Sequence, residues 1–165
     1  MHLLQPLLFF AVPQVHFQEV IEVAASHSLI RIRSVIDEAK MDFEYPGEYA
    51  FKDETHLIVY TDYTGNLITK CAIQANTSGM LLHRSGAFSG DMFFSLTNPT
   101  FVDYQADMLA AKMIIHTYRY ELIREEHRLM IVLEYHLSAP EGKNRSTVDQ
   151  TIEILFGEMK ENRLQ

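Results

Sequence analysis

The stretch between His83 and Phe94, HRSGAFSGDMFF, holds the residue types of a nucleophilic or phosphate-binding turn. Its order G-x-x-S-G around Ser89 misses the G-x-S-x-G elbow of serine hydrolases by one position, and no strand-to-helix pattern surrounds it. A phosphate-binding loop would lead into a helix, whereas the strand-like segment MFFSL follows Gly90. We therefore predict a β-hairpin whose glycines supply the positive φ angles of the turn.

Arg84 is the residue of this stretch that could hold a ligand. On an alternating strand it shares a face with Met80, Leu82 and Gly86, so an inward orientation of that face would bury a guanidinium. Burying a charge is costly unless the charge is paired. Arg84 then either meets an internal carboxylate or holds the carboxylate or phosphate of a ligand. The alternative is an arginine on the solvated face.

A second candidate group follows, because His116, Tyr118 and Tyr120 alternate along one predicted strand. Tyr135 lies on the next strand, and in-register pairing would bring these imidazole and hydroxyl groups together. They would either line a cavity or form an ordinary aromatic core or outer belt. With Arg84, these four residues are the predicted ligand-binding residues.

Catalytic and metal-binding constellations do not emerge from the sequence. The eight histidines include no pair at strand or helix spacing with a third ligand nearby, and no matched acid–base pair is recognisable. Cys71 lies between Thr69 and Ile73 on an apolar face, which is typical of a buried, inert thiol. We expect no enzyme activity, no metal and no cofactor.

Composition favours a single domain. The chain has 165 residues, of which 47% are hydrophobic and 22% charged, enough for one genuine core. Its net charge of −8 repels phosphate backbones, so we expect no nucleic-acid partner. A single cysteine fits a reducing compartment, and we predict a cytoplasmic protein.

The N-terminal segment MHLLQPLLFFAV is apolar but does not match a signal peptide, because no basic residue precedes the apolar run and Pro6 and Pro13 interrupt it. The run is also shorter than the roughly 20 residues of a membrane span. Helical spacing after Pro13 predicts a short amphipathic helix over residues 14–26. We assign residues 1–28 to an N-terminal extension, 29–157 to the domain and 158–165 to a tail.

From Leu29 onward the hydrophobic period is two, which is typical of strands. Residues 55–63 and 66–75 flank Thr64 and Gly65, the spacing of a tight hairpin. An earlier strand is expected to end or bulge at the Pro-Gly pair at 46–47, and residues 107–113 allow a turn of helix. Three long alternating runs follow: MIIHTYRYELI, RLMIVLEYHLS and TVDQTIEILF.

The fold class predicted from these runs is mainly β. About 8 to 10 antiparallel strands joined by short turns would leave exposed sheet edges, and closure into a meandering barrel removes them. No repeat or low-complexity tract indicates a propeller or a linker.

The order of these features resembles a bacterial family, the YwiB-like domains of unknown function. The segments that carry the resemblance are YPGEYAFKDETHLIVYTDY, MLLHRSGAFSGDMFF, HTYRYEL and LMIVLEYHL, within residues 29–156. The resemblance implies a calycin-like barrel similar to lipocalins and fatty-acid-binding proteins, and it brings no established activity or site.

Two functional classes follow from a barrel of this kind. In the first, the interior binds a small apolar or amphipathic ligand. In the second, side chains fill the interior and the protein acts as an interaction or structural module, for example as a homodimer. Ten Phe and eight Tyr are enough bulk to plug a small barrel, so the sequence leaves both classes open.

Overall fold

The computed structural model describes residues 26–157, which form ten β-strands and no helix. The strands are β1 (Ser26–Ile36), β2 (Ala39–Lys52), β3 (Thr55–Asp62), β4 (Thr69–Asn76), β5 (Gly79–Gly86), β6 (Phe88–Phe94), β7 (Thr100–Ala106), β8 (Leu109–Arg124), β9 (Arg128–Ser138) and β10 (Ser146–Phe156). Each strand pairs antiparallel with the next, and β10 pairs with β1, which closes the barrel. The predicted meandering barrel is confirmed.

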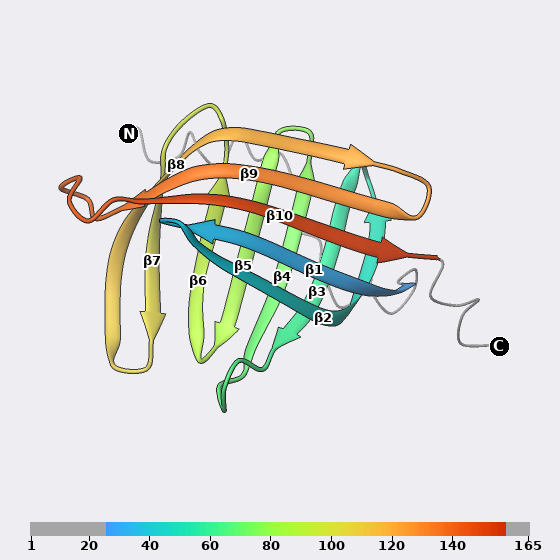
Figure 1. Ribbon diagram of the computed structural model, residues 1–165, viewed down its shortest axis with the longest axis horizontal. Coiled ribbons are helices and arrows are strands. Elements are labelled where there is room, and N and C mark those ends of the chain that lie inside the picture. Colours follow the sequence, from blue (N-terminus) through green and yellow to red (C-terminus); the bar gives the residue numbers. More distant parts are fainter. Residues whose placement is uncertain (1–25, 158–165) are drawn as a thin grey trace.

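The barrel is made of two groups of strands that cross at a steep angle. In Figure 1, β8, β9, β10 and β1 cross over β3 to β6, and the long strands β2 and β8 bend from one group into the other. Closure joins β1 to β10 along nine residue pairs, with Ile32 opposite Ile152 near the middle. The seam is therefore continuous, whereas β6 and β7 pair only through Phe88 with Ala106 and Ser89 with Gln105.

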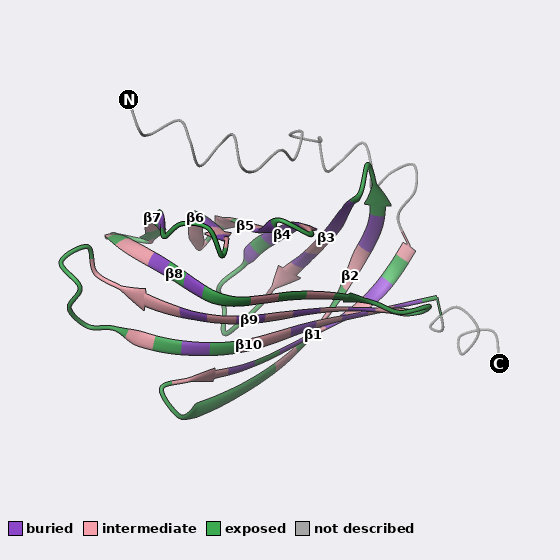
Figure 2. Cartoon of the chain, turned by 90° about the horizontal axis from the view of Figure 1, so that it is seen from above, coloured by how far each residue is buried: buried purple, intermediate pink, exposed green. Residues whose placement is uncertain are grey.

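One face of every strand lies in the barrel interior, as period-two patterning requires. Buried and exposed bands alternate along the strands in Figure 2. The fully buried inner side chains include Ile30, Ile58, Ile73, Met80, Leu129, Ile131, Leu133 and Ile154. These aliphatic residues fill one part of the interior and supply the main hydrophobic stabilisation of the fold.

The strand β2 neither ends nor bulges at its Pro-Gly pair, so that prediction is wrong. Pro46 pairs in register with Leu29, and the strand continues to Lys52. A Cβ on Gly47 would lie 2.1 Å from Ile30 Cδ1 and 2.5 Å from the carbonyl oxygen of Val59. The absent side chain thus permits the close approach at which β2 bends, and the strand continues instead of stopping.

The connection between β3 and β4 is longer than the predicted two-residue turn. Residues 63–68 connect Asp62 to Thr69, and Leu67 in this connection is exposed. Asp62 holds the start of this loop by accepting hydrogen bonds from the N–H and the hydroxyl of Thr64. Residues 107–113 form a turn followed by strand β8, and no turn of helix is present.

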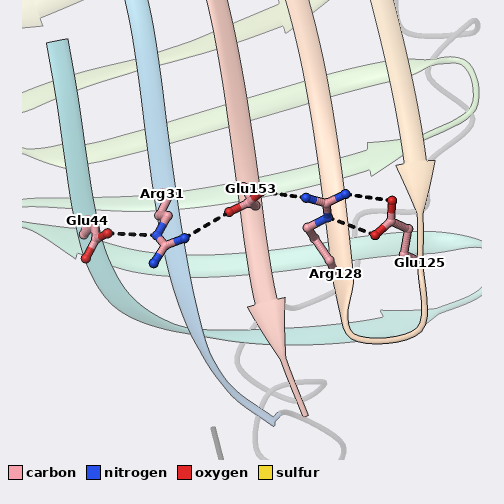
Figure 3. Close-up of polar contacts among 5 residues, drawn as sticks. All are labelled: Arg31, Glu44, Glu125, Arg128 and Glu153. Atoms are coloured by element: carbon pink, nitrogen blue, oxygen red, sulfur yellow. Dashed lines mark hydrogen bonds and ion pairs between the residues drawn. The ribbon is translucent and has the colours of Figure 1, made fainter. Parts of the chain in front are cut away.

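An ion-pair network on the outer face crosses the closing seam. Arg31 on β1 contacts Glu44 on β2 at 2.8 Å and Glu153 on β10 at 3.4 Å. Arg128 on β9 contacts the other oxygen of Glu153 at 3.1 Å and Glu125 at 2.7 Å (Figure 3). Both arginines are thus fully paired on a partly solvated surface, where such pairs contribute modestly to stability.

Strand β1 begins at Ser26, so residues 26–28 belong to the barrel. The predicted helix over residues 14–26 otherwise lies outside the described residues, as does the tail 158–165.

Candidate functional site

The stretch HRSGAFSGDMFF forms the predicted hairpin between β5 and β6. Its turn lies at Gly86, whose φ of 119° suits glycine and whose added Cβ would lie 2.5 Å from the carbonyl oxygen of Ile68. Ser89 pairs with Gln105 on the neighbouring strand, and the inward positions beside it are Phe88 and Gly90. The serine therefore faces outward and has no part in an interior site.

Arg84 faces the barrel interior. It follows the buried inner residues Met80 and Leu82 on β5, and its neighbours in register are Cys71 on β4 and Gly90 on β6. Gly90 contributes no side chain beside it, which leaves space for the guanidinium. Of the two orientations that the sequence left open for Arg84, inward and solvent-facing, the structure has the inward one.

Cys71 lies next to Arg84 in the strand pairing, Tyr60 lies next to Cys71 on β3, and the charge of Arg84 also acts on Tyr135. Burial raises the pKa of Tyr60 well above its usual range, raises the pKa of Tyr135 to about 12 and raises the pKa of the Cys71 thiol, although Arg84 opposes each shift. All three groups are therefore uncharged at neutral pH. They can donate or accept hydrogen bonds, but they do not neutralise the arginine.

Within residues 26–157, Arg84 forms no ion pair, in contrast to Arg31 and Arg128. The inward carboxylate of Asp62 is near enough to act on Cys71, but it is bound to Thr64 in the β3–β4 loop. A half-buried guanidinium without a carboxylate is expensive to maintain for stability alone. The arrangement provides a positive charge inside the barrel.

A second polar group points into the interior nearby. Thr117 on β8 lies directly opposite Tyr135 on β9 and is only 4% exposed. Among the described residues, its Oγ1 atom has no hydrogen-bond partner. Buried hydroxyls are normally paired, so an unpaired one at this inner position is unusual.

Aromatic side chains line the interior on the same side as Arg84. Phe43 and Tyr45 on β2, Phe88 on β6 and Tyr104 on β7 are inward but only partly buried. The rings of Tyr45 and Tyr60 stack at 5.0 Å, and those of Phe88 and Tyr104 at 6.0 Å. Solvent thus reaches the end of the barrel that carries the β3–β4, β5–β6 and β7–β8 turns (bottom of Figure 1).

Tyr135 and Tyr120 both face inward, but they differ in their partners. Tyr135 packs edge-on against Phe94 with ring centroids 4.8 Å apart. The positive charge of Arg84 also lowers the pKa of Tyr135, against the larger effect of burial. The Tyr120 hydroxyl shares its single proton between the carbonyl oxygens of Asn76 at 2.6 Å and Gly79 at 3.0 Å. Tyr120 therefore stabilises the β4–β5 turn through hydrogen bonds, whereas Tyr135 belongs to the candidate site.

Replacement of Tyr120 by phenylalanine should lower the free energy of unfolding by about 1–2 kcal/mol, because two turn carbonyls lose their donor. Urea unfolding measures the change. Tyr118→Phe is the matched control and should leave stability unchanged. Equal stability of Tyr120→Phe and the wild type would show that the two hydrogen bonds contribute nothing.

His116 and Tyr118 lie on the outer face, so the expectation that they share a face with Tyr120 is wrong. The pairing of β8 with β9 shifts between Thr117 and Arg119, and this β-bulge inserts one extra residue. The inward-facing residues of β8 therefore have odd numbers before the bulge and even numbers after it. His116 and Tyr118 point outward together with His136, which lies directly opposite His116 on β9.

Sequence reasoning missed Thr117 and Tyr60 as interior site residues. Thr117 was missed because the unbroken alternation placed His116 inside and its neighbour outside. Tyr60 follows the inner period of its strand, but only the closed barrel shows that it meets Arg84 from β5. Residues 26–157 contain no group of three or more His, Cys, Asp or Glu that could hold a metal, and no helix with the length and hydropathy of a membrane span.

Comparison with known proteins gives a family and a fold. The family model described as "Domain of unknown function (DUF1934)" matches residues 30–152. The crystal structure of ywiB protein from Bacillus subtilis is similar with a TM-score of 0.72 and 18% sequence identity, over 81% of this chain and 93% of that chain. At this identity the likeness shows the barrel fold alone. No curated protein matches the chain.

Proposed function

Because the chain belongs to the DUF1934 family of domains of unknown function, we propose a function from the chemistry of its barrel: the interior binds a small amphipathic ligand that carries an anionic group. Arg84 faces that group, and Tyr60, Tyr135 and Thr117 hydrogen-bond it. The apolar part of the ligand lies against the aromatic side chains toward the solvent-exposed end. We propose a binding protein without catalytic activity.

The observation that carries this proposal is the inward guanidinium of Arg84 without a carboxylate partner among residues 26–157. A ligand carboxylate or phosphate would supply the missing charge, and charge-assisted hydrogen bonds to arginine are among the stronger polar contacts. The unpaired Oγ1 atom of Thr117 supports the same location independently. Thr117 lies directly opposite Tyr135, and the charge of Arg84 acts on the same tyrosine, which supports a single headgroup position between the two groups.

The second candidate function is a filled barrel that acts as an interaction module. The aliphatic side chains that are 0% exposed, such as Ile58, Ile131 and Leu133, support it because they occupy part of the interior. The ligand proposal therefore concerns the part beside Arg84, where inner side chains are less buried. We further propose a cytoplasmic, bacterial protein, which suits its buried free thiol Cys71. A homodimer remains a prediction.

Native mass spectrometry of the purified protein, compared with its denatured mass, tests the proposal. We expect a non-covalent adduct or, after its removal, binding of dansylundecanoic acid detected by fluorescence. The methyl ester of this probe should bind at least about tenfold more weakly, because it lacks the charge that Arg84 faces. A clean apo mass together with no binding of the acid would leave the filled barrel as the function, and the spectrum also reports a dimer.

A further inference from the structure

A groove of about 870 Å³ lies on the outer face of β7, β8 and β9, beside the β9–β10 loop. This volume is in the usual range of small-molecule sites. Its side chains include Phe101, Ile114, His116, Tyr118, His136 and Arg145. The groove is separate from the barrel interior, because every one of these strand residues belongs to the outward-facing set.

The β-bulge in β8 builds the central part of this groove. It leaves Tyr118 on the outer face beside the cross-strand pair His116 and His136, and the Tyr118 ring lies 4.8 Å from the His136 ring. His136 Nδ1 and Thr147 Oγ1 are 3.2 Å apart, which orients the imidazole. Within the described part of the chain, Nε2 of His136 has no such partner and remains for a ligand.

The charge of the groove is opposite to that of the protein. The chain carries a net charge of −8, yet none of the residues that line the groove is acidic. Arg145 forms no ion pair with any residue of 26–157. Of the carboxylates near Tyr118, Glu134 is paired with Arg119 at 3.6 Å, while Asp149 has no ion pair in the same part of the chain.

An exposed aromatic ring completes the site. Phe101 on β7 is 74% exposed, although phenylalanine is normally buried in a domain with its own core. It lines the same groove as Tyr118, so two aromatic rings adjoin the cationic and imidazole groups. A planar ring with an attached anion would contact both kinds of group at once.

We propose that this outer groove binds a small organic anion in which an aromatic ring carries a phosphate or carboxylate group. Arg145, His116 and His136 face the anion, and Phe101 and Tyr118 contact the ring. This site is independent of the interior site beside Arg84, and neither requires the other.

Binding of phenyl phosphate and of benzoate tests the site, with the side-chain NMR signals of His116 and His136 as the readout. We expect saturable shifts of both signals with at least one of the two probes, and the stronger probe identifies phosphate or carboxylate as the preferred group. Inorganic phosphate lacks the aromatic ring and phenol lacks the anionic group, so each should bind at least about tenfold more weakly. Absence of shifts up to about 10 mM of both probes, or equal binding of phenol, would overturn the proposal.

Two arginine variants distinguish a specific role of the groove from a non-specific effect of net charge on probe binding. Arg145→Gln should weaken the preferred probe about tenfold, whereas Arg33→Gln, on the outer face of β1, should leave its binding unchanged. Dansylundecanoic acid should bind Arg145→Gln and the wild type alike, so failure of one site is distinguishable from failure of the other. Equal loss in both arginine variants would reduce the effect to net charge and contradict the site.

A pH titration of the His136 signal gives a readout that a structural role would not change. Burial lowers the pKa of His136, and Arg145 and His116 lower it further. Tyr118 and Thr147 contact the His136 ring, and the carboxylates nearby, Glu134 and Asp149, act on Tyr118. A bound anion stabilises the imidazolium, so the midpoint should rise when the preferred probe is present. An unchanged midpoint at saturation would contradict contact between the anion and His136.

Discussion

Replacement of Arg84 by methionine is expected to abolish tight binding of an anionic amphipathic probe and to make the empty protein more stable. The affinity for dansylundecanoic acid should fall by about 10- to 100-fold, because charge-assisted hydrogen bonds to the guanidinium are lost. The free energy of unfolding should rise by about 1 kcal/mol, because a half-buried charge without a carboxylate partner is replaced by an apolar side chain of similar length.

Opposite signs of the two effects make this test specific. Fluorescence titration measures the affinity, and urea unfolding of the same preparations measures stability. Arg33→Met changes the net charge equally on the outer face, and it should leave the affinity unchanged. Thr117→Val removes the unpaired hydroxyl and should reduce affinity with no loss of stability. Unchanged binding in Arg84→Met would refute the interior headgroup site, and a less stable apo protein would show that Arg84 supports the barrel itself.

Replacement of Gly86 by alanine is expected to destabilise the barrel by about 3 kcal/mol, through backbone strain and a steric clash. The residue has a φ of 119°, and a Cβ there would lie 2.5 Å from the carbonyl oxygen of Ile68. That carbonyl cannot move away freely, because it accepts a hydrogen bond from the N–H of Ala87 at 2.9 Å. Urea unfolding of the variant measures the loss.

Two further variants isolate the clash. Gly142→Ala also introduces a side chain at positive φ, 80°, but nothing lies within 4 Å of the new Cβ, so its cost should be confined to about 1 kcal/mol of backbone strain. Ser89→Ala, in the same hairpin as Gly86, should change neither stability nor binding. A Gly86→Ala variant no less stable than Gly142→Ala would mean that the turn relaxes around the new methyl group.

The interior site and the outer groove share one wall of the barrel. Thr117 faces inward and Tyr118 faces outward at the same bulge of β8. A change in this bulge would therefore alter both sites, whereas substitutions at Arg84 and Arg145 act on one site each. This separation is why the two arginines are the informative positions.

The sequence alone was sufficient to predict the fold class and which residues share a strand face with Arg84, but it left open whether that face points inward. Alternation along a strand follows from the geometry of the backbone, so Arg84 could be placed on the face of Met80 and Leu82 without knowledge of its neighbours. The burial of Met80 and Leu82 in the closed barrel then shows that this face is the inner one. The hairpin at HRSGAFSGDMFF was likewise predictable, because positive φ at Gly86 is a local requirement. These properties depend on residues close together in the chain.

Only the tertiary structure decided which groups share a site. A single inserted residue in β8 reverses the alternation, so His116 and Tyr118 leave the predicted interior and join His136 and Arg145 outside. Nothing within that strand marks the bulge, because its position depends on how β8 pairs with β9 and bends between the two groups of strands. The meeting of Arg84, Tyr60 and Tyr135 likewise depends on strands β5, β3 and β9, which closure of the barrel brings around one interior space.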